Sequence, residues 1–423
     1  MSARSGAGVV RENLPNGLTV LVEPLKEFSS VSVGVWVLIG SRDETEIQSG
    51  ISHFIEHLVF KGTSRRTAKQ IALEIDSLGG SLNAFTSKEF TCFYARVLGE
   101  SLTQALDVLS DITLNSLFAG DDLVKEKDVI LQEISMVEDT PDDLVHDLHC
   151  REFWAGQGIG WPVLGTRDSL LAIGSGNVLD FHRSHYRPEQ MLITASGAVD
   201  SNDLIDRIGS IFGELEPGTS PVLRSAPRPT PGICVLEKPV EQIHFCVGYN
   251  GLPATHEKRY AMYLLNTLLG GGMSSRLFQK IREEQGLAYS VYSYHSTYQD
   301  AGLHTIYCGT SREGFSKALE IIREETENLA AERPPEEELT IARQQLKGNL
   351  LLGLESTGNR MNQLAKNEIY FGRQVSPEEI AEGIDSVTSE QVRQLASELF
   401  VEESTALTVI GPVSEEEVRD LMG

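Results

Sequence analysis

Two histidines and a glutamate recur at helical spacing within one apolar stretch of the sequence. The stretch runs from Ser52 to Phe60 and contains His53, Glu56 and His57 in the order H-x-x-E-H. On a helix, positions i, i+3 and i+4 share one face, so the two imidazoles lie one turn apart with the carboxylate beside them. Paired imidazoles suit zinc, and a neighbouring glutamate can take a proton from a zinc-bound water. The pattern therefore predicts hydrolytic chemistry at a metal site.

A catalytic zinc site needs a third protein ligand, and the best candidate lies on the helix predicted near residues 122–137. Glu126 and Glu133 fall on the same stripe of that helix as the apolar residues Ile130 and Val137. Buried carboxylates are costly unless they are paired or bind a metal, so we expect one glutamate to bind the ion and the other to orient a ligand. Two plainer interpretations stay open here. The histidines and glutamate of the motif could be polar residues of an amphipathic helix that binds no metal. The apolar stripe of the second helix could also be shifted, so that both glutamates face solvent.

The elements that must position these residues are strands and helices in separate clusters. The first half predicts strands at 17–22 and 31–37, the motif helix, a helix at 67–78 that ends in a glycine pair, strands at 81–86 and 90–97, and helices near 102–116, 122–137 and 142–154. Clustering of this kind favours an α+β fold, with a mainly antiparallel sheet and helices packed on one face, over a doubly wound fold.

A proline-rich break divides the chain into halves of similar length. Residues 217–232 contain five of the 16 prolines and are predicted to form a linker. The second half opens like the first, with strand patterns at 233–236 and 243–248 before a helix pattern at 259–269, and the segments 191–199 and 406–413 also match each other. We therefore predict two homologous αβ units, a zinc-binding catalytic domain at 1–216 and a second domain at 233–423 without zinc.

The composition is that of a globular protein with an acidic surface. The 423 residues are 40% hydrophobic and 23% charged, and the net charge of -25 argues against a nucleic-acid partner. No apolar stretch reaches membrane-spanning length and the start of the chain has no secretory pattern, so we expect a cytoplasmic protein without a membrane partner. Processing of a short N-terminal targeting segment stays open. The five scattered cysteines are expected to be reduced thiols.

These residues and their spacing resemble the pitrilysin-type zinc metallopeptidases, whose H-x-x-E-H signature inverts the commoner H-E-x-x-H. By size the chain is similar to the β-subunit of the mitochondrial processing peptidase and its bacterial homologues, and the resemblance covers nearly the whole sequence. It implies one Zn²⁺ per chain, bound by His53, His57 and Glu133. It also implies that Glu56 is the general base and that Glu126 supports the site.

The segment Gly80–Ser87 resembles the family's edge strand, where an extended substrate peptide adds to the sheet as a further strand. In such β-augmentation, backbone hydrogen bonds provide affinity that depends little on the substrate sequence. The resemblance therefore implies substrate contacts from Asn83, Ala84 and Phe85. By its own residues, the segment predicts only a short strand after a Gly-Gly turn.

Arg282 and Tyr289 in the second domain resemble the family's arginine–tyrosine pair, which contacts substrate near the zinc. Tyr289 would donate to a developing oxyanion and Arg282 would bind a substrate carbonyl. By their own patterns, the two residues are a helix-end cation and a core strand residue. In long family members this pair and the zinc lie in different units. The resemblance therefore implies a homodimer, or a dimer with a related chain, in which one subunit completes the site of the other.

The function implied by the resemblance is endopeptidase cleavage of unfolded peptides or presequence-like segments, bound in extended conformation inside a closed chamber. One alternative is a non-catalytic structural or partner subunit, against which the intact motif argues. The other is a dedicated precursor-maturation protease. Two further histidine pairs, His146 with His149 and His182 with His185, lack a base at catalytic spacing and are predicted to pack at the surface or in the core.

Overall fold

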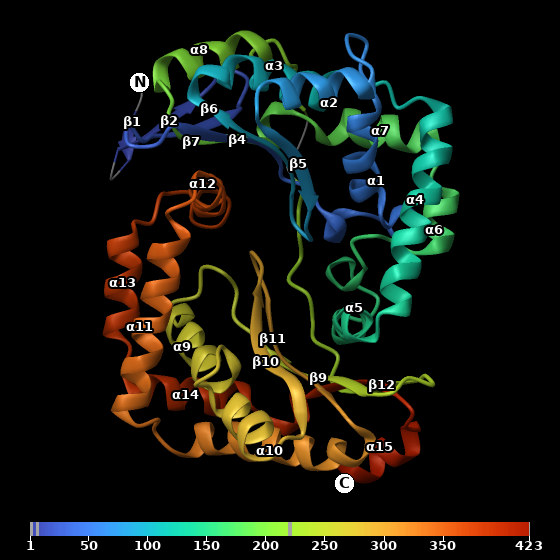
Figure 1. Ribbon diagram of the computed structural model, residues 1–423, viewed down its shortest axis with the longest axis vertical. Helices are drawn as coiled ribbons and strands as arrows, with labels where there is room; N and C mark the ends of the chain where they lie inside the picture. Colours follow the sequence, from blue (N-terminus) through green and yellow to red (C-terminus); the bar gives the residue numbers. More distant parts are fainter. Residues whose placement is uncertain (1–2, 6–7, 219–221, 423) are drawn as a thin grey trace. The chain divides into compact units, whose positions relative to one another are not determined.

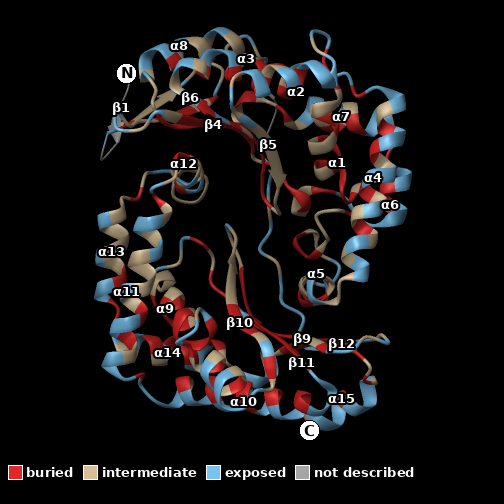
Figure 2. Cartoon of the chain, in the orientation of Figure 1, coloured by how far each residue is buried: buried red, intermediate tan, exposed pale blue. Residues whose placement is uncertain are grey.

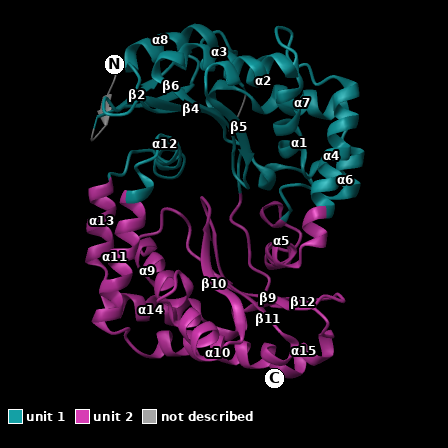
Figure 3. Ribbon diagram, viewed as in Figure 1, with its two compact units in different colours: residues 1–135, 161–224, 352–376 teal, residues 136–160, 225–351, 377–423 magenta. Residues whose placement is uncertain are grey.

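The computed structural model describes residues 3–5, 8–218 and 222–422 (Figure 1). The chain forms two compact units (Figure 3). Unit 1 comprises residues 1–135, 161–224 and 352–376, and unit 2 comprises residues 136–160, 225–351 and 377–423. These units differ from the contiguous domains predicted at 1–216 and 233–423, because each incorporates a segment from the opposite half of the sequence. Within the predicted linker, residues 219–221 lie outside the described part of the chain.

Unit 1 is built on a seven-stranded sheet in the order β1-β2-β3-β7-β4-β6-β5. The strands are β1 (Ala3–Ser5), β2 (Val9–Asn13), β3 (Thr19–Pro24), β4 (Ser30–Val37), β5 (Ser81–Thr86), β6 (Thr91–Leu98) and β7 (Met191–Gly197). β3 and β7 pair in parallel, and the other neighbours are antiparallel. Val31, Val33 and Val35 of β4 are buried on one face, as the period of two predicts.

Helices cover that face of the sheet and enclose the larger core of unit 1, where buried residues concentrate (Figure 2). They are α1 (Ile51–Leu58), α2 (Ala68–Ser77), α3 (Leu102–Asn115), α4 (Gly120–Asp139), α6 (Arg167–Ala172), α7 (Ser175–His185) and α8 (Ser201–Phe212). Residues 136–139 of α4 belong to unit 2. The strands and helices predicted for the first half therefore occur close to their predicted positions.

Unit 2 repeats the arrangement on a five-stranded sheet in the order β10-β11-β9-β12-β8. Its strands are β8 (Gly232–Glu237), β9 (Ile243–Asn250), β10 (Ala288–Thr297), β11 (Gly302–Thr310) and β12 (Ala406–Gly411). β8 and β12 are parallel, like β3 and β7. Its helices are α9 (Arg259–Gly270), η7 (Phe278–Glu284), α10 (Arg312–Ala331), α11 (Glu336–Gly353), α13 (Pro377–Ser386), α14 (Ser389–Leu399) and α15 (Glu415–Met422). The last two residues of α11 belong to unit 1.

The second face of each sheet is covered by a helix from the other half of the sequence. In unit 1 this helix is α12 (Thr357–Phe371), whose Met361 packs with Trp36 of β4. In unit 2 it is α5 (Pro141–Phe153), whose Val145 packs with Cys246 of β9. This exchange explains why the compact units are not contiguous in sequence.

The predicted α+β class with two homologous units is confirmed. The order β3-β7-β4-β6-β5 in unit 1 corresponds strand for strand to β8-β12-β9-β11-β10 in unit 2. The prediction of helices on one face holds for the helices that stay with their own half. It does not hold for α5, predicted at 142–154, or for α12, because each covers the second face of the other half's sheet. Within the described residues, no helix combines the length and the apolar character needed to cross a membrane.

Candidate metal centre

The helix α1 presents its histidines because its apolar residues take the buried side. Phe54, Ile55 and Leu58 lie in the core of unit 1. Their spacing leaves the remaining face of the helix to His53 and His57, whose ring centroids are 4.6 Å apart. The amphipathic pattern of this short segment therefore sets the direction of both imidazoles.

The start of α1 is held by Glu44, a buried residue that the sequence prediction missed. Its carboxylate accepts hydrogen bonds from the backbone N–H groups of Gly50 (2.7 Å) and Ser52 (2.8 Å), donors that a helix N-terminus otherwise leaves unpaired. Gly50 precedes the helix with a φ of 92°, in the left-handed region that favours glycine. Burial raises the pKa of Glu44 to about 7, although the backbone hydrogen bonds act in the opposite direction.

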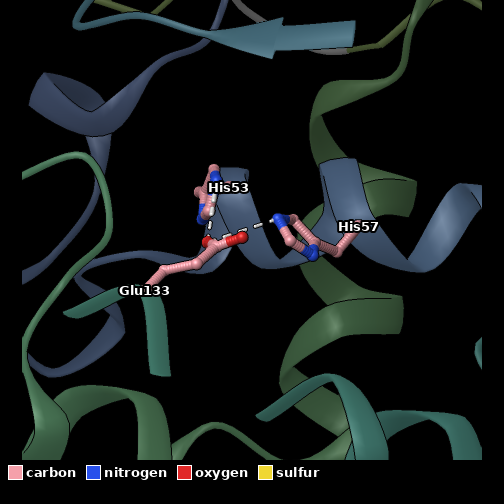
Figure 4. Close-up of side chains that lie close together, drawn as sticks. All are labelled: His53, His57 and Glu133. Atoms are coloured by element: carbon pink, nitrogen blue, oxygen red, sulfur yellow. Dashed lines mark ion pairs between the residues drawn. The ribbon is translucent and has the colours of Figure 1, made fainter. Parts of the chain in front are cut away.

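His53, His57 and Glu133 converge from two helices, with their polar atoms directed toward one another (Figure 4). Glu133 Oε2 lies 3.9 Å from His53 Nε2 and 3.6 Å from His57 Nε2. One nitrogen from each ring and one carboxylate oxygen lie within 4.8 Å of one another, and no other group of three His, Cys, Asp or Glu side chains has this geometry within the described residues. The structure thus brings together the three residues predicted as metal ligands.

This set of side chains fits a zinc ion. Two imidazole nitrogens and one carboxylate oxygen form a known catalytic zinc set, which leaves a coordination position open. Burial, with a smaller contribution from His57, lowers the pKa of His53 to about 3, so His53 is neutral near pH 7. A neutral imidazole has the lone pair that metal binding requires. The Glu133 side chain is 36% exposed, so solvent can reach this position.

Glu126 lies behind the three side chains and contacts His57. Its Oε2 is 3.2 Å from His57 Nδ1, so the other nitrogen of the same ring remains directed toward Glu133. A carboxylate in this position orients a histidine ligand, and the geometry fits the supporting role that the resemblance implies. The second oxygen of Glu126, Oε1, lies 2.7 Å from Lys61 Nζ, a contact that was not predicted.

Glu56, the candidate base, is held by a side chain from the sheet edge. Its Oε2 accepts a hydrogen bond of 2.5 Å from the hydroxyl of Thr86, the last residue of β5. Burial raises the pKa of Glu56, and the Thr86 hydrogen bond and His57 oppose this shift. A carboxylate with a raised pKa is suited to accept and return a proton near neutral pH.

The predicted substrate strand, β5, is the edge strand of the unit 1 sheet and pairs with β6. Asn83 is exposed, and Phe85 packs with its ring centroid 5.7 Å from that of Trp36. The backbone N–H of Ala84 donates to the Oδ1 of Asn83 at 2.8 Å. A backbone N–H group of the edge strand is therefore already hydrogen-bonded to the Asn83 side chain.

Arg282 and Tyr289 are neighbours within unit 2. The Arg282 guanidinium carbon lies 4.4 Å from the centroid of the Tyr289 ring and 4.8 Å from that of Phe278. The pairing of β10 with β11 shifts register between Ala288 and Ser290, so Tyr289 lies in a β-bulge, which re-aims a side chain. Tyr289 is 80% exposed. The alternative interpretation of Tyr289 as a core strand residue is therefore wrong.

Three histidines of the two other pairs contact neighbouring polar groups of the protein. His146 contacts two tyrosine hydroxyls, at 2.8 and 3.0 Å. His149 lies 2.9 Å from the Thr408 hydroxyl, and His182 lies 2.8 Å from the backbone oxygen of Thr113. The five cysteines are free thiols.

Three residues around the metal centre, Lys61, Glu44 and Thr86, make contacts that the sequence did not predict. Lys61 follows His57 by one helical turn, so helical spacing carried a signal for it. Glu44 and Thr86 reach the motif helix from a preceding loop and from the sheet edge. Spacing within one helix gives no signal for such contacts.

Both halves of the chain match models of one peptidase family. Residues 19–167 match the family model described as Insulinase (Peptidase family M16), and residues 173–346 match the one described as Peptidase M16 inactive domain. The chain belongs to this family.

Similar proteins cover nearly the whole chain. YmxG of Bacillus subtilis (strain 168), named an uncharacterized zinc protease, is 41% identical over 96% of this chain and 98% of its own length. An uncharacterized zinc protease of Streptomyces coelicolor is also 41% identical, over 98% of this chain and 92% of its own length. The crystal structure of a protease from Helicobacter pylori shares the fold, with a TM-score of 0.90 at 21% identity, over 96% of this chain and 99% of that chain.

Proposed function

We propose that this chain is a zinc-dependent endopeptidase in which His53, His57 and Glu133 bind one ion. The observation that carries the proposal is the convergence of two imidazole nitrogens and a carboxylate oxygen within 4.8 Å, beside Glu56 on the same helix. The names of the relatives as zinc proteases support it. When bound, zinc lowers the pKa of a coordinated water and polarises a substrate carbonyl.

Glu56 is the general base of the proposed reaction. Its carboxylate takes a proton from the attacking water and then gives a proton to the leaving amine, a cycle to which its raised pKa is suited. The Thr86 hydroxyl holds one carboxylate oxygen, so the other is available for this proton transfer. Glu126 keeps the His57 ring in its ligating orientation through the contact at Nδ1.

The substrate in this proposal is an extended peptide, of the unfolded or presequence-like kind, that adds to the edge of β5. A substrate carbonyl would accept from the backbone N–H of Ala84, which now donates to the Asn83 side chain. Backbone pairing of this kind tolerates many sequences. The edge-strand position of β5, with Phe85 packed behind it, supports this assignment.

Arg282 and Tyr289 provide further substrate contacts, in a dimer where the pair of one copy completes the zinc site of the other. The exposure of Tyr289 and its contact with Arg282 support a role in binding. Glu56→Gln and Tyr289→Phe chains are each expected to be impaired, and mixing them should restore activity at one composite site. If mixing restores nothing although subunit exchange is verified, the pair does not act across a homodimer.

The function is tested with Glu56→Gln. This variant should retain one zinc per chain and lose cleavage of an unfolded peptide by about 10²- to 10⁴-fold, the usual contribution of general acid–base catalysis. Glu46→Gln makes the same charge change at an exposed position and should behave like the unaltered chain. Full turnover of metal-loaded Glu56→Gln would show that another group is the base. A zinc-loaded chain without chelator-sensitive cleavage would favour the non-catalytic subunit.

A further inference from the structure

The buried carboxylate of Glu126 has a different partner on each oxygen. Oε2 faces His57 Nδ1 at 3.2 Å, and Oε1 faces Lys61 Nζ at 2.7 Å. Glu126 is 5% exposed, and a carboxylate at such a position needs charged or hydrogen-bonding partners to offset its lost hydration. Lys61 therefore belongs to the metal centre although it does not contact the position of the ion.

Lys61 reaches Glu126 because of the way α1 ends. The helix continues into a single 3-10 turn, η3 (Val59–Lys61), and the chain then turns away at Gly62, which has a φ of 133°. Lys61 thus lies one turn beyond His57, and residues at this spacing share a face of the helix. Both side chains consequently approach Glu126 from the same side, and the Lys61 side chain remains 35% exposed.

The ammonium group of Lys61 has two effects on zinc binding, and they have opposite signs. As a nearby cation it repels a divalent ion, so its removal would tighten binding. As the partner of Oε1 it fixes the Glu126 carboxylate and thereby the His57 ring, so its removal would weaken binding. The repulsion acts through a partly hydrated ammonium and is reduced by salt, whereas the contact with buried Glu126 is direct. The second effect should therefore dominate.

We infer that Lys61 is a positioning residue that sets the zinc affinity of the site through Glu126. Its ammonium holds the carboxylate so that Oε2 stays on His57 Nδ1 and His57 Nε2 stays directed at the ion. The inference rests on the proposed zinc site, and it is independent of whether the chain cleaves peptides. It gives Lys61 a role that can be measured by metal binding alone.

The test is the zinc dissociation constant of the full-length protein, measured by competition with a chromophoric chelator. Lys61→Met should weaken zinc binding by about 3- to 10-fold, at or below the lower end of the effect of losing an outer-shell partner. Lys61→Arg keeps a cation that can reach Oε1 and should stay close to the unaltered chain. Lys125→Met is the matched control, because it also replaces a lysine with methionine. Lys125 lies on α4 and pairs with Asp122, not with Glu126.

The role of Glu126 is tested in a second background. If Lys61 acts through this carboxylate, Lys61→Met should add little to the weakening caused by Glu126→Gln, since two residues of one network are not additive. Unchanged or tighter binding by Lys61→Met overturns the inference, and so does an equal loss in both backgrounds. The proposed zinc site survives those outcomes. If the unaltered chain binds no zinc, the site and the inference both fail.

Loss of the fold is separated from loss of positioning by the melting temperature of each zinc-free variant. The zinc affinity of Lys61→Met is interpreted only if that temperature matches the unaltered chain. Lys61→Gln takes its place if Lys61→Met does not fold, because glutamine is polar but has no charge, and its amide nitrogen lies one bond nearer the backbone than the lysine Nζ that contacts Oε1. The same weakening is expected for it, and an unchanged affinity would overturn the inference.

Discussion

Units 1 and 2 have the same sheet and different side-chain chemistry. Their strand orders correspond, and each sheet includes an equivalent parallel pair, β3 with β7 and β8 with β12. The next strand in each sheet is β4, which pairs with β7, and β9, which pairs with β12. In the sequence, α1 is the first α-helix after β4, and α9 is the first α-helix after β9. Of these two helices, α1 carries the histidine pair. The fold therefore provides two equivalent positions, and the side chains decide which one can bind a metal.

The two helices also begin differently. Two N–H groups at the start of α1, those of Gly50 and Ser52, donate to the buried carboxylate of Glu44, whereas at the start of α9 the N–H of Lys258 donates to the Nδ1 of His256 at 3.1 Å. A metal centre requires its first ligands to be held within about 0.5 Å of a productive geometry. The hydrogen bonds from Glu44 at the start of α1 are consistent with this requirement. The helix α9 carries no histidine pair, so the requirement does not apply to it.

The largest effect is expected when unit 1 loses Glu133, the proposed third ligand, and thereby becomes chemically more like unit 2. Glu133→Ala should weaken zinc binding by more than about 100-fold, beyond the range for outer-shell partners. Chelator competition and metal content after dialysis measure this. Asp128→Ala, at an exposed position of the same helix, should bind zinc normally. Retention of full zinc affinity by Glu133→Ala would mean that the third ligand is another residue.

A second difference concerns how each sheet accepts its exchanged helix. A Cβ atom added at Gly248 of β9 would lie 2.2 Å from His149 Nε2 on α5. One added at Gly34 of β4 would lie 3.0 Å from Met361 Sδ on α12 and from Trp36 Nε1. Gly248→Ala should lower the stability by about 1–3 kcal/mol, because the rigid imidazole must move against the sheet. Melting temperatures measure the change.

Gly34→Ala provides the matched comparison in unit 1. Its cost should be under about 1 kcal/mol, because contacts of 3.0 Å with Met361 and Trp36 need shifts of only a few tenths of an ångström and alanine is preferred to glycine within a strand. Adding His149→Ala to Gly248→Ala should recover part of the loss if the clash is its cause. Equal losses for the two glycine variants would show that the imidazole is not the obstacle.

Much of the metal centre was predictable because it depends on spacing within single helices. The period of 3.6 residues placed His53 with His57 and placed Glu126 with Glu133, and the alternating strand patterns placed the sheets. The exchange of α5 and α12 was not predictable in this way, because an amphipathic helix can cover any apolar sheet face. The bulge at Tyr289 was also hidden, since it depends on pairing with β11.

The anchoring of α1 is tested with Glu44→Gln. An amide has one oxygen, so one of the two backbone hydrogen bonds should be lost, at a cost of about 1–2 kcal/mol. Burial raises the pKa of Glu44 from 4.5 to about 7, so the folded state holds this proton more tightly than the unfolded state. The stability contributed by the carboxyl group is thus fully present below about pH 4.5 and is lost as the pH rises through 7.

The destabilisation caused by Glu44→Gln should consequently be larger at pH 5 than at pH 8, and chemical denaturation at both pH values measures it. Glu46→Gln, an exposed neighbour, should show little effect at either pH. A loss that grows with pH would show that Glu44 is bound as an anion whose pKa is lowered by the helix terminus.

The smallest effect is expected at Thr86, which links the sheet edge of unit 1 to Glu56, the proposed base. Thr86→Val removes the hydroxyl that donates to Glu56 at 2.5 Å. The contact orients Glu56 without touching the substrate, so kcat should fall by about 3- to 10-fold, corresponding to roughly 1 kcal/mol of a hydrogen bond, while KM stays unchanged. Thr86→Ser keeps the hydroxyl and should recover most of kcat.

Thr19→Val separates this positioning role from a general effect on the strands. Thr19 lies on β3 of the same sheet and its hydroxyl donates to the Oδ1 of Asn13 at 3.1 Å, so its loss should leave kcat unchanged. If Thr86→Val and Thr19→Val lower kcat equally, the strands act only as a scaffold. If kcat falls with Thr86→Val alone, the edge strand of unit 1 has a function beyond pairing, because it fixes Glu56.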